Sequence, residues 1–235
     1  MHRPYHDRPD WAGELIHPQE ELDRLVEEFH SRGLQLAVHC NGDAAISSVL
    51  EALEKAQEKC YRPDTRHLLV HCQTAGEEHI DRIKALGAMP SYFIKHVYYW
   101  GDDHAEKYLG PGRAAMISPL ESTRAKGLPF TLHSDMPVTP ASPLFAIHCA
   151  VNRTTRSGRI LGPGQRIDAY TALKAYTSWA ARASFEEEVK GSIEPGKLAD
   201  FAVLSDDPVT TPPETIKDIE PIATYLGGEF VWGEE

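Results

Sequence analysis

The feature that most constrains the fold of this chain is the regular spacing of three polar residues, each at the end of an apolar run. His39 ends the run 34–39, His71 ends the run 67–71, and Asp135 follows the run 128–134. The two histidines are 32 residues apart, and His71 and Asp135 are 64 residues apart, which is twice that distance. Because a β-strand with its crossover helix takes about 30 residues, this spacing predicts that each polar residue ends a strand of one parallel sheet.

The segments between these runs have helical patterns. A third strand is predicted at 88–93, in the position between the strands of His71 and Asp135, and it opens into an aromatic stretch at 94–103. Strands that alternate with helices predict right-handed crossovers and therefore an α/β fold with a parallel sheet. The predicted helices cover 18–33, 44–58, 77–86, 113–126 (kinked or split at Pro119), and regions around 143–151 and 170–184.

The pattern changes after about residue 190. A turn-rich segment is followed by a short strand at 200–204, and two further runs, 223–226 and 229–232, flank Gly227-Gly228. A two-residue Gly-Gly turn between such runs is typical of a β-hairpin. We therefore predict an α/β unit over 1–190 and a small antiparallel β module over 191–235, which is too small to be stable without a surface to pack on.

Composition narrows the classes of partner. The chain has 235 residues and a formal charge of −11, which argues against nucleic acid and anionic membranes and leaves a small-molecule substrate. No apolar run reaches the roughly 20 residues that a membrane span needs, and no signal peptide is recognisable. The four cysteines show no CxxC spacing, which is typical of reduced thiols in a cytoplasmic protein.

Two imidazoles and a carboxylate are a common ligand set for a divalent metal, with zinc as the expected ion. We therefore predict His39, His71 and Asp135 as metal ligands, although any single buried histidine can also be an ordinary core residue. Asp135 is also the predicted general base that takes a proton from the attacking water, with a cap of the following turn as its alternative. Cys40 and Cys72 follow the two histidines and are expected to face away from the metal and pack in the core.

Three further residues are candidates for substrate contacts. Alternation along the strand places His133 on the face of Asp135, where it contacts substrate or orients the carboxylate. His96, beyond the third strand, is predicted to donate to a substrate carbonyl and stabilise the developing oxyanion, with a surface-loop position as its alternative. Tyr98 and the aromatic residues next to it line the pocket, or else belong to the core or an interface.

These residues lie in segments that resemble the metal-dependent amidohydrolases of the YtcJ-like group, which includes N-substituted formamide deformylases. The resemblance implies hydrolysis of a non-peptide C–N bond, in an amide, formamide or cyclic amide, by metal-activated water. By motif match it implies His39 and His71 as metal ligands, Asp135 as general base and His96 as the substrate-polarising residue, and Arg113 is a further candidate for substrate binding. The segments are VHCNGDAA (38–45), RHLLVHCQ (66–73), KHVYYWGDDH (95–104), LGPGRA (109–114), HSDMPVTPASPL (133–144) and GSIEPGKLADFAVL (191–204).

The resemblance also implies the architecture: the C-terminal half of a (β/α)8 barrel of the TIM type, strands five to eight with their helices, plus part of a flanking β-sandwich. The N-terminal half, with its HxH metal motif, has no counterpart in these residues. Because half a barrel leaves two strand edges unpaired, we expect a homo-oligomer or pairing with a missing N-terminal half, and only weak metal binding by the chain alone. The alternatives are a truncated, non-catalytic binding or assembly half, and a barrel hydrolase that cleaves a C–O, P–O or C–Cl bond.

Overall fold

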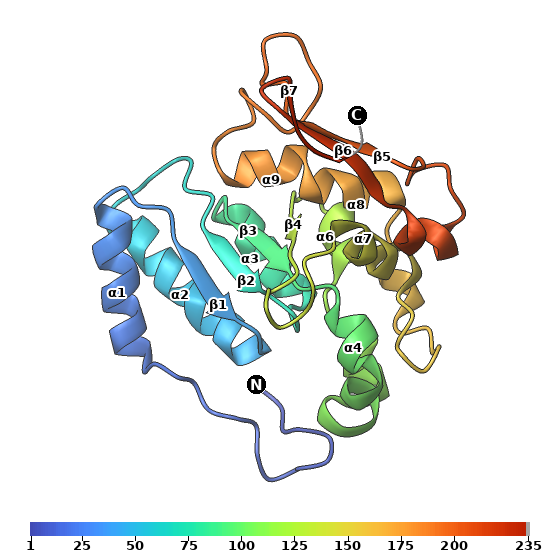
Figure 1. The fold of residues 1–235 in the computed structure, drawn as a ribbon. Helices are drawn as coiled ribbons and strands as arrows, with labels where there is room; N and C mark the ends of the chain where they lie inside the picture. The colour runs from blue at the N-terminus through green and yellow to red at the C-terminus, as the bar shows by residue number, and fades with distance from the viewer. Residues whose placement is uncertain (234–235) are drawn as a thin grey trace.

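The structure, a computed structural model, describes residues 1–233, which form a parallel sheet and a smaller antiparallel sheet (Figure 1). The parallel sheet has the strand order β1-β2-β3-β4, so consecutive strands are neighbours, as expected for strands joined by helical crossovers. Its alternation of strand and helix confirms the predicted α/β class. The strands are β1 (Ala37–Cys40), β2 (Leu68–His71), β3 (Met89–Tyr92) and β4 (Thr131–Leu132).

The helices fall between the strands and after them. In Figure 1 residues 1–18 form a long irregular segment that leads into α1, and α7 to α9 separate β4 from the second sheet. The helical segments are α1 (Gln19–Ser31), α2 (Asp43–Lys59), α3 (Glu77–Ala85), α4 (His96–Asp103), the π-helical η1 (His104–Tyr108), α5 (Gly110–Ala114), α6 (Leu120–Ala125), α7 (Pro143–Asn152), the 3₁₀ turn η2 (Pro163–Gln165), α8 (Ala169–Tyr176), α9 (Ser178–Ala183) and the 3₁₀ segment η3 (Pro213–Asp218).

Two helical elements differ from the sequence prediction. The aromatic stretch forms α4, which the pattern did not identify. The predicted helix 170–184 is broken at Thr177, whose φ of −122° and ψ of −98° lie outside the helical region. The predicted helix 113–126 is split into α5 and α6 around Pro119, as expected from that proline.

The fourth strand is shorter than predicted. The run 128–134 keeps only Thr131–Leu132 in the ladder, and Asp135 has a φ of 50°, which no strand residue adopts. The prediction that strand alternation carries His133 and Asp135 to one face is therefore wrong, because both lie beyond the strand. Their positions depend instead on the loop that connects β4 to α7.

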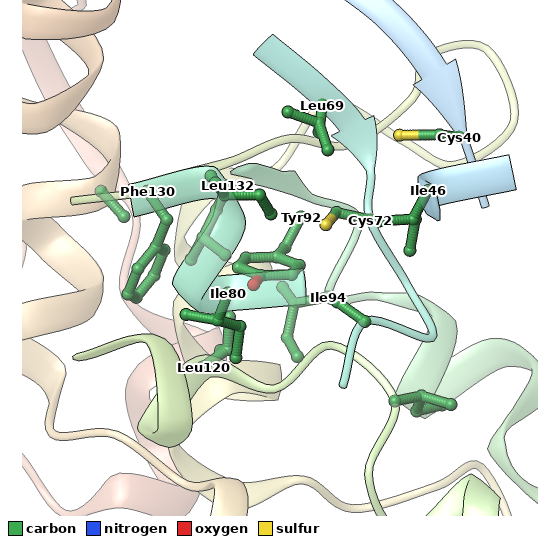
Figure 2. Packing of buried hydrophobic residues seen from close by; sticks show 14 of the residues in the cluster. Cys40, Ile46, Leu69, Cys72, Ile80, Tyr92, Ile94, Leu120, Phe130 and Leu132 are labelled. Atoms are coloured by element: carbon green, nitrogen blue, oxygen red, sulfur yellow. The ribbon is translucent and has the colours of Figure 1, made fainter. Parts of the chain in front are cut away.

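The core lies between the parallel sheet and the helices that cover it (Figure 2). On α2, Ile46, Val49 and Leu53 recur at helical spacing and are buried, which explains how this helix packs on the sheet. Figure 2 shows the thiols of Cys40 and Cys72 among these apolar side chains, as predicted. Burial raises the pKa of Cys40 to about 12, so this thiol is protonated and packs as an apolar group.

The antiparallel sheet consists of β5 (Phe201–Leu204), β6 (Pro221–Leu226) and β7 (Glu229–Gly233). Gly227 and Gly228 join β6 to β7 with φ angles of 60° and 84°, as a type I′ hairpin turn requires, and this confirms the predicted hairpin. The boundary at residue 190 between two units stays a prediction. Among the described residues, no helix is both long and apolar enough to cross a membrane.

Candidate metal and substrate site

The carboxyl ends of the parallel strands bring four histidines together. His39 is exposed on β1, His71 is buried at the end of β2, and their ring centroids lie 4.7 Å apart at an interplanar angle of 76°. The ring of His71 also lies 5.0 Å from that of His133 and 6.4 Å from that of His96. The predicted convergence of strand-end residues is therefore present for these imidazoles.

The backbone of His71 explains how its ring reaches His39. In the parallel ladder His71 is the register partner of Cys40, whose side chain is buried in the core on the helix side of the sheet. A regular strand would send His71 to that same side. Instead His71 has a φ of 70° and Cys72 a φ of 46°, so the chain turns at the strand end and the His71 ring lies against His39. Left-handed residues of this kind cluster at functional sites.

His133 and Asp135 follow β4, and the ring of His133 lies beside that of His71. The backbone N–H of His133 donates to the carbonyl of Tyr92 at 3.0 Å, which continues the ladder by one bond. Burial lowers the pKa of His133 to about 4 and also lowers that of His71, whereas the negative charge of Asp135 opposes both shifts. The Asp135 carboxylate therefore acts electrostatically on both imidazoles.

Lys95 holds the loop that carries Asp135. Its Nζ donates to Ser134 Oγ at 2.8 Å and to the carbonyl of Pro140 at 2.6 Å, and the side chain is fully buried. Burial lowers the pKa of Lys95. The two hydrogen bonds connect the start of α4 to both ends of the segment 134–140.

His96 is the first residue of α4, so the surface-loop alternative does not describe it. Its Nδ1 lies 3.3 Å from Nε2 of His104, and that same nitrogen of His104 lies 2.9 Å from the side-chain amide nitrogen of Gln73. Burial lowers the pKa of His96 to about 3 and that of His104 to about 4, so both rings are neutral near pH 7. A neutral imidazole can donate one hydrogen bond and accept another.

A cavity of about 450 Å³ opens beside these rings. His96 is the one predicted site residue among its lining groups, which also include His104, Gln73 and Asn41. The lining also includes residues of the N-terminal segment and of the region between α4 and α5, which are apolar or aromatic except for the charged Asp7 and Arg8: Met1, Tyr5, Asp7, Arg8, Trp11, Tyr108 and Leu109. A mostly apolar pocket with a few converging polar groups is the usual form of a small-molecule site.

Two predicted substrate residues lie elsewhere. Tyr98 packs against Phe145, with ring centroids 4.9 Å apart, at the edge of the core. Arg113 donates to the carbonyls of Leu109 at 2.8 Å and Pro4 at 2.7 Å, and lines a separate cavity of about 260 Å³. In this structure Arg113 connects α5 to the N-terminal segment by its hydrogen bond to Pro4, and its contact with substrate stays a prediction.

The donor set fits a divalent metal in part. His71 Nδ1 and His133 Nε2 are buried without a hydrogen-bond partner among the described residues, so each nitrogen is free to bind a ligand. Within residues 1–233, however, no three His, Cys, Asp or Glu side chains are grouped closely enough to hold a metal ion. The structure thus pairs two of the three predicted ligands, His39 and His71, and the complete set with Asp135 stays a prediction.

Sequence reasoning missed His104, Gln73 and Lys95. His96 and His104 are eight residues apart, about two helical turns, so they share a face only if the aromatic stretch is a helix. That spacing is the signal that could have identified His104. Lys95 had no comparable signal, because a lysine next to a histidine is ordinary in a surface loop.

Comparisons with known proteins bear on the family of this chain. The model of the amidohydrolase family matches residues 1–232. The chain is 32% identical over 239 aligned residues to the putative amidohydrolase YtcJ of Bacillus subtilis (strain 168), covering 99% of this chain and 44% of that protein. It is 30% identical over 218 residues to the N-substituted formamide deformylase of Arthrobacter pascens, covering 92% of this chain and 40% of that enzyme.

A solved structure of a metal-dependent hydrolase is also similar to this chain. An uncharacterized metal-dependent hydrolase from Pyrococcus horikoshii OT3 superimposes with a TM-score of 0.77 at 27% identity, covering 90% of this chain and 42% of that one. The chain therefore spans less than half the length of these relatives. Because the family model matches the chain almost from end to end, the protein belongs to the amidohydrolase family.

Proposed function

We propose that this chain forms part of the active site of a metal-dependent hydrolase that cleaves a non-peptide C–N bond in an amide, formamide or cyclic amide. The observation that carries the proposal is the pairing of the His39 and His71 rings, 4.7 Å apart, at the carboxyl ends of adjacent parallel strands. This edge of a parallel sheet is where α/β enzymes place their chemistry. The similarity to an N-substituted formamide deformylase supports the class of bond.

His39, His71 and Asp135 are the residues that would hold the metal, with zinc as the proposed ion. Imidazole nitrogens and a carboxylate suit zinc, and the unpartnered Nδ1 of His71 supports a ligand role for that ring. A bound divalent ion in such a site polarises a carbonyl group and makes water a stronger acid.

Two residues have proposed roles in the proton transfers. The Asp135 carboxylate takes a proton from the attacking water while the new C–O bond forms, and it returns that proton to the nitrogen as the C–N bond breaks. His96 donates a hydrogen bond to the carbonyl oxygen as negative charge develops on it. The position of His96 in the cavity wall supports this role.

The test is hydrolysis of a panel of N-substituted formamides, linear amides and cyclic amides by the zinc-loaded protein, with Asp135→Asn as the blank. Phosphate and carboxylate esters and haloalkanes in the same panel test a different bond. Turnover confined to C–N substrates and absent from Asp135→Asn supports the proposal. Turnover confined to the other bonds contradicts it.

A second candidate function is a non-catalytic binding or assembly half. The observation that favours it is that residues 1–233 hold no group of three metal-ligating side chains. In addition, β1 pairs only with β2 and β4 only with β3 among the described strands, so each has one unpaired edge. Unpaired edges of this kind invite pairing with another chain.

We infer from this that the parallel sheet is half of a closed (β/α)8 barrel that is completed by an N-terminal half or by a second copy. Ala37 and His39 are exposed on β1, as expected of side chains that would face the interior of the completed barrel. A panel that shows no turnover, together with stable pairing between chains, favours the assembly function over the enzyme.

A further inference from the structure

His104 contacts the proposed carbonyl-binding residue but has no part in the function proposed above. Its Nε2 lies 3.3 Å from His96 Nδ1 and 2.9 Å from the side-chain amide of Gln73. Both imidazoles line the cavity of about 450 Å³. The protonation pattern of this trio decides which nitrogen of His96 can donate to a molecule in the cavity.

The surroundings of His104 fix its own tautomer. Its Nδ1 is buried and has no hydrogen-bond partner among the described residues. A proton on Nδ1 would be an unpaired buried N–H, which is rarer and costlier than an unpaired lone pair. The proton is therefore on Nε2, where Nδ1 of His96 can accept it. The orientation of a Gln amide is assigned from the network around it, and this N–H requires the Gln73 oxygen in the position where the structure places the amide nitrogen, 2.9 Å away.

The tautomer of His96 follows from that of His104. Because His104 Nε2 carries a proton 3.3 Å away, Nδ1 of His96 is the acceptor, and a second N–H at that position would face the first. The proton of the neutral His96 ring is therefore on Nε2. Within residues 1–233, Nε2 of His96 makes no hydrogen bond and is not among the fully buried polar atoms, so it is the nitrogen open to the cavity.

We propose that His104 is a positioning residue that holds His96 as the Nε2–H tautomer, so that His96 donates a hydrogen bond to a carbonyl oxygen in the cavity. The donation to a carbonyl rests on the proposed function, whereas the tautomer rests on the trio of side chains alone. Gln73 acts one step further away by accepting from the same N–H of His104.

The test is the ¹⁵N spectrum of the imidazole rings in histidine-labelled protein. In the wild-type chain we expect His96 Nδ1 in the unprotonated range and Nε2 in the protonated range. In His104→Phe both shifts move toward their average as the two tautomers mix, and in His104→Gln, which keeps an amide donor, they return to the wild-type pattern. A wild-type His96 protonated on Nδ1, or wild-type shifts retained in His104→Phe, would overturn the proposal. If His104→Phe does not fold, the wild-type spectrum and His104→Gln still decide it.

Kinetics on the same variants separate this proposal from the proposed function. If the enzyme hydrolyses a C–N substrate, His104→Phe should lower kcat about tenfold or more with KM nearly unchanged, and His104→Gln should restore most of it. An unchanged kcat in His104→Phe would overturn the positioning role. If no substrate is hydrolysed but the tautomer shifts as expected, the proposed function fails and the inference about His104 stands.

Discussion

The rings of His39 and His71 lie 4.7 Å apart, although the strand ladder pairs His71 with Cys40 and not with His39. The left-handed backbone at His71, with a φ of 70°, turns its ring away from the core and toward its neighbour. A non-glycine residue in this conformation is strained. This backbone turn brings the two imidazoles together at the carboxyl ends of β1 and β2, and the proposed metal site depends on that pair.

The first prediction concerns the general base. Asp135→Asn removes the proton acceptor but keeps the size of the side chain, so kcat should fall by about 10²- to 10⁴-fold on any C–N substrate that the protein hydrolyses. Asp81→Asn is the matched control, because Asp81 is an exposed carboxylate whose partner is Lys126. Activity retained in Asp135→Asn would remove this residue from the chemistry.

The second prediction concerns Arg153, which follows α7 directly, has a left-handed backbone conformation and is fully buried. Its guanidinium donates to the carbonyls of Leu161, Ser118 and Ile117 at 2.8, 3.1 and 2.8 Å. Arg153→Met leaves the carbonyls of Leu161 and Ile117 unpaired, whereas that of Ser118 keeps the N–H of Leu120 at 2.8 Å, and it should lower the free energy of unfolding by about 3 kcal/mol. Arg153→Lys should recover only part of it, since an ammonium cannot reproduce the planar fork.

Urea titrations of these variants give the free energies. Ser118 donates its N–H to the carbonyl of Gln73 at 2.7 Å, so loss of Arg153 should also disturb the Gln73–His104 contact. A stability for Arg153→Met within 0.5 kcal/mol of wild type, roughly the effect of a surface change, would show that these three bonds contribute little.

The third prediction is a loss of stability in acid through His67. Its Nδ1 accepts the N–H of Leu36 at 3.0 Å and its Nε2 lies 2.9 Å from Nδ1 of His30, so both of its ring nitrogens are engaged in the neutral form. Burial, and then the neighbouring His30 and Arg62, lower the pKa of His67 from 6.5 to about 4. The unfolded chain therefore binds a proton that the folded chain does not between these two values.

The contribution of His67 to stability is complete above pH 6.5 and falls as the pH drops toward 4, by an amount on the order of 2 kcal/mol. His67→Asn, which keeps an acceptor but does not titrate, should show a shallower fall in unfolding free energy between pH 7 and pH 4.5. His17→Asn, at an exposed histidine on the surface, is the control. Equal slopes in wild type and His67→Asn would contradict the assignment.

The fourth prediction concerns the open edge of the sheet. If β1 and β4 pair with another chain, light scattering on a size-exclusion column should show an assembly larger than the 26.2 kDa monomer, or poor solubility. Ala37→Lys places a charge on the exposed face of β1 and should weaken that assembly, whereas Ala85→Lys, at an exposed position at the end of α3, should not. A stable, monodisperse wild-type monomer would contradict the pairing.

Much of the fold could be predicted from the sequence because its signals are local. The apolar spacing on α2, the Gly227-Gly228 turn and the placement of His39 and His71 at the ends of adjacent apolar runs each depend on neighbouring residues, and each is present in the structure. The bounds of β4 could not be predicted, because the ladder stops where the backbone of the following loop turns, and no residue type marks that point.

The site was predictable in position but less so in detail. The 32-residue interval brought His39 and His71 together correctly, although it did so through a backbone turn that strand periodicity does not include. His104 was missed because its contact with His96 depends on the helical form of an aromatic segment. Lys95 was missed because its partners, Ser134 and Pro140, are about 40 residues away in the chain and meet it only through the fold.

The measurement that tests the central claim most directly is titration of the metal-free protein with Co²⁺ or Zn²⁺, followed by absorbance or calorimetry. We expect one weak site, since two paired imidazoles and a nearby carboxylate give an incomplete ligand set. Binding should be lost in His39→Ala and in His71→Ala and retained in His17→Ala, which changes an exposed histidine just before α1. Metal binding that is unchanged in His39→Ala and His71→Ala would contradict the proposed metal site.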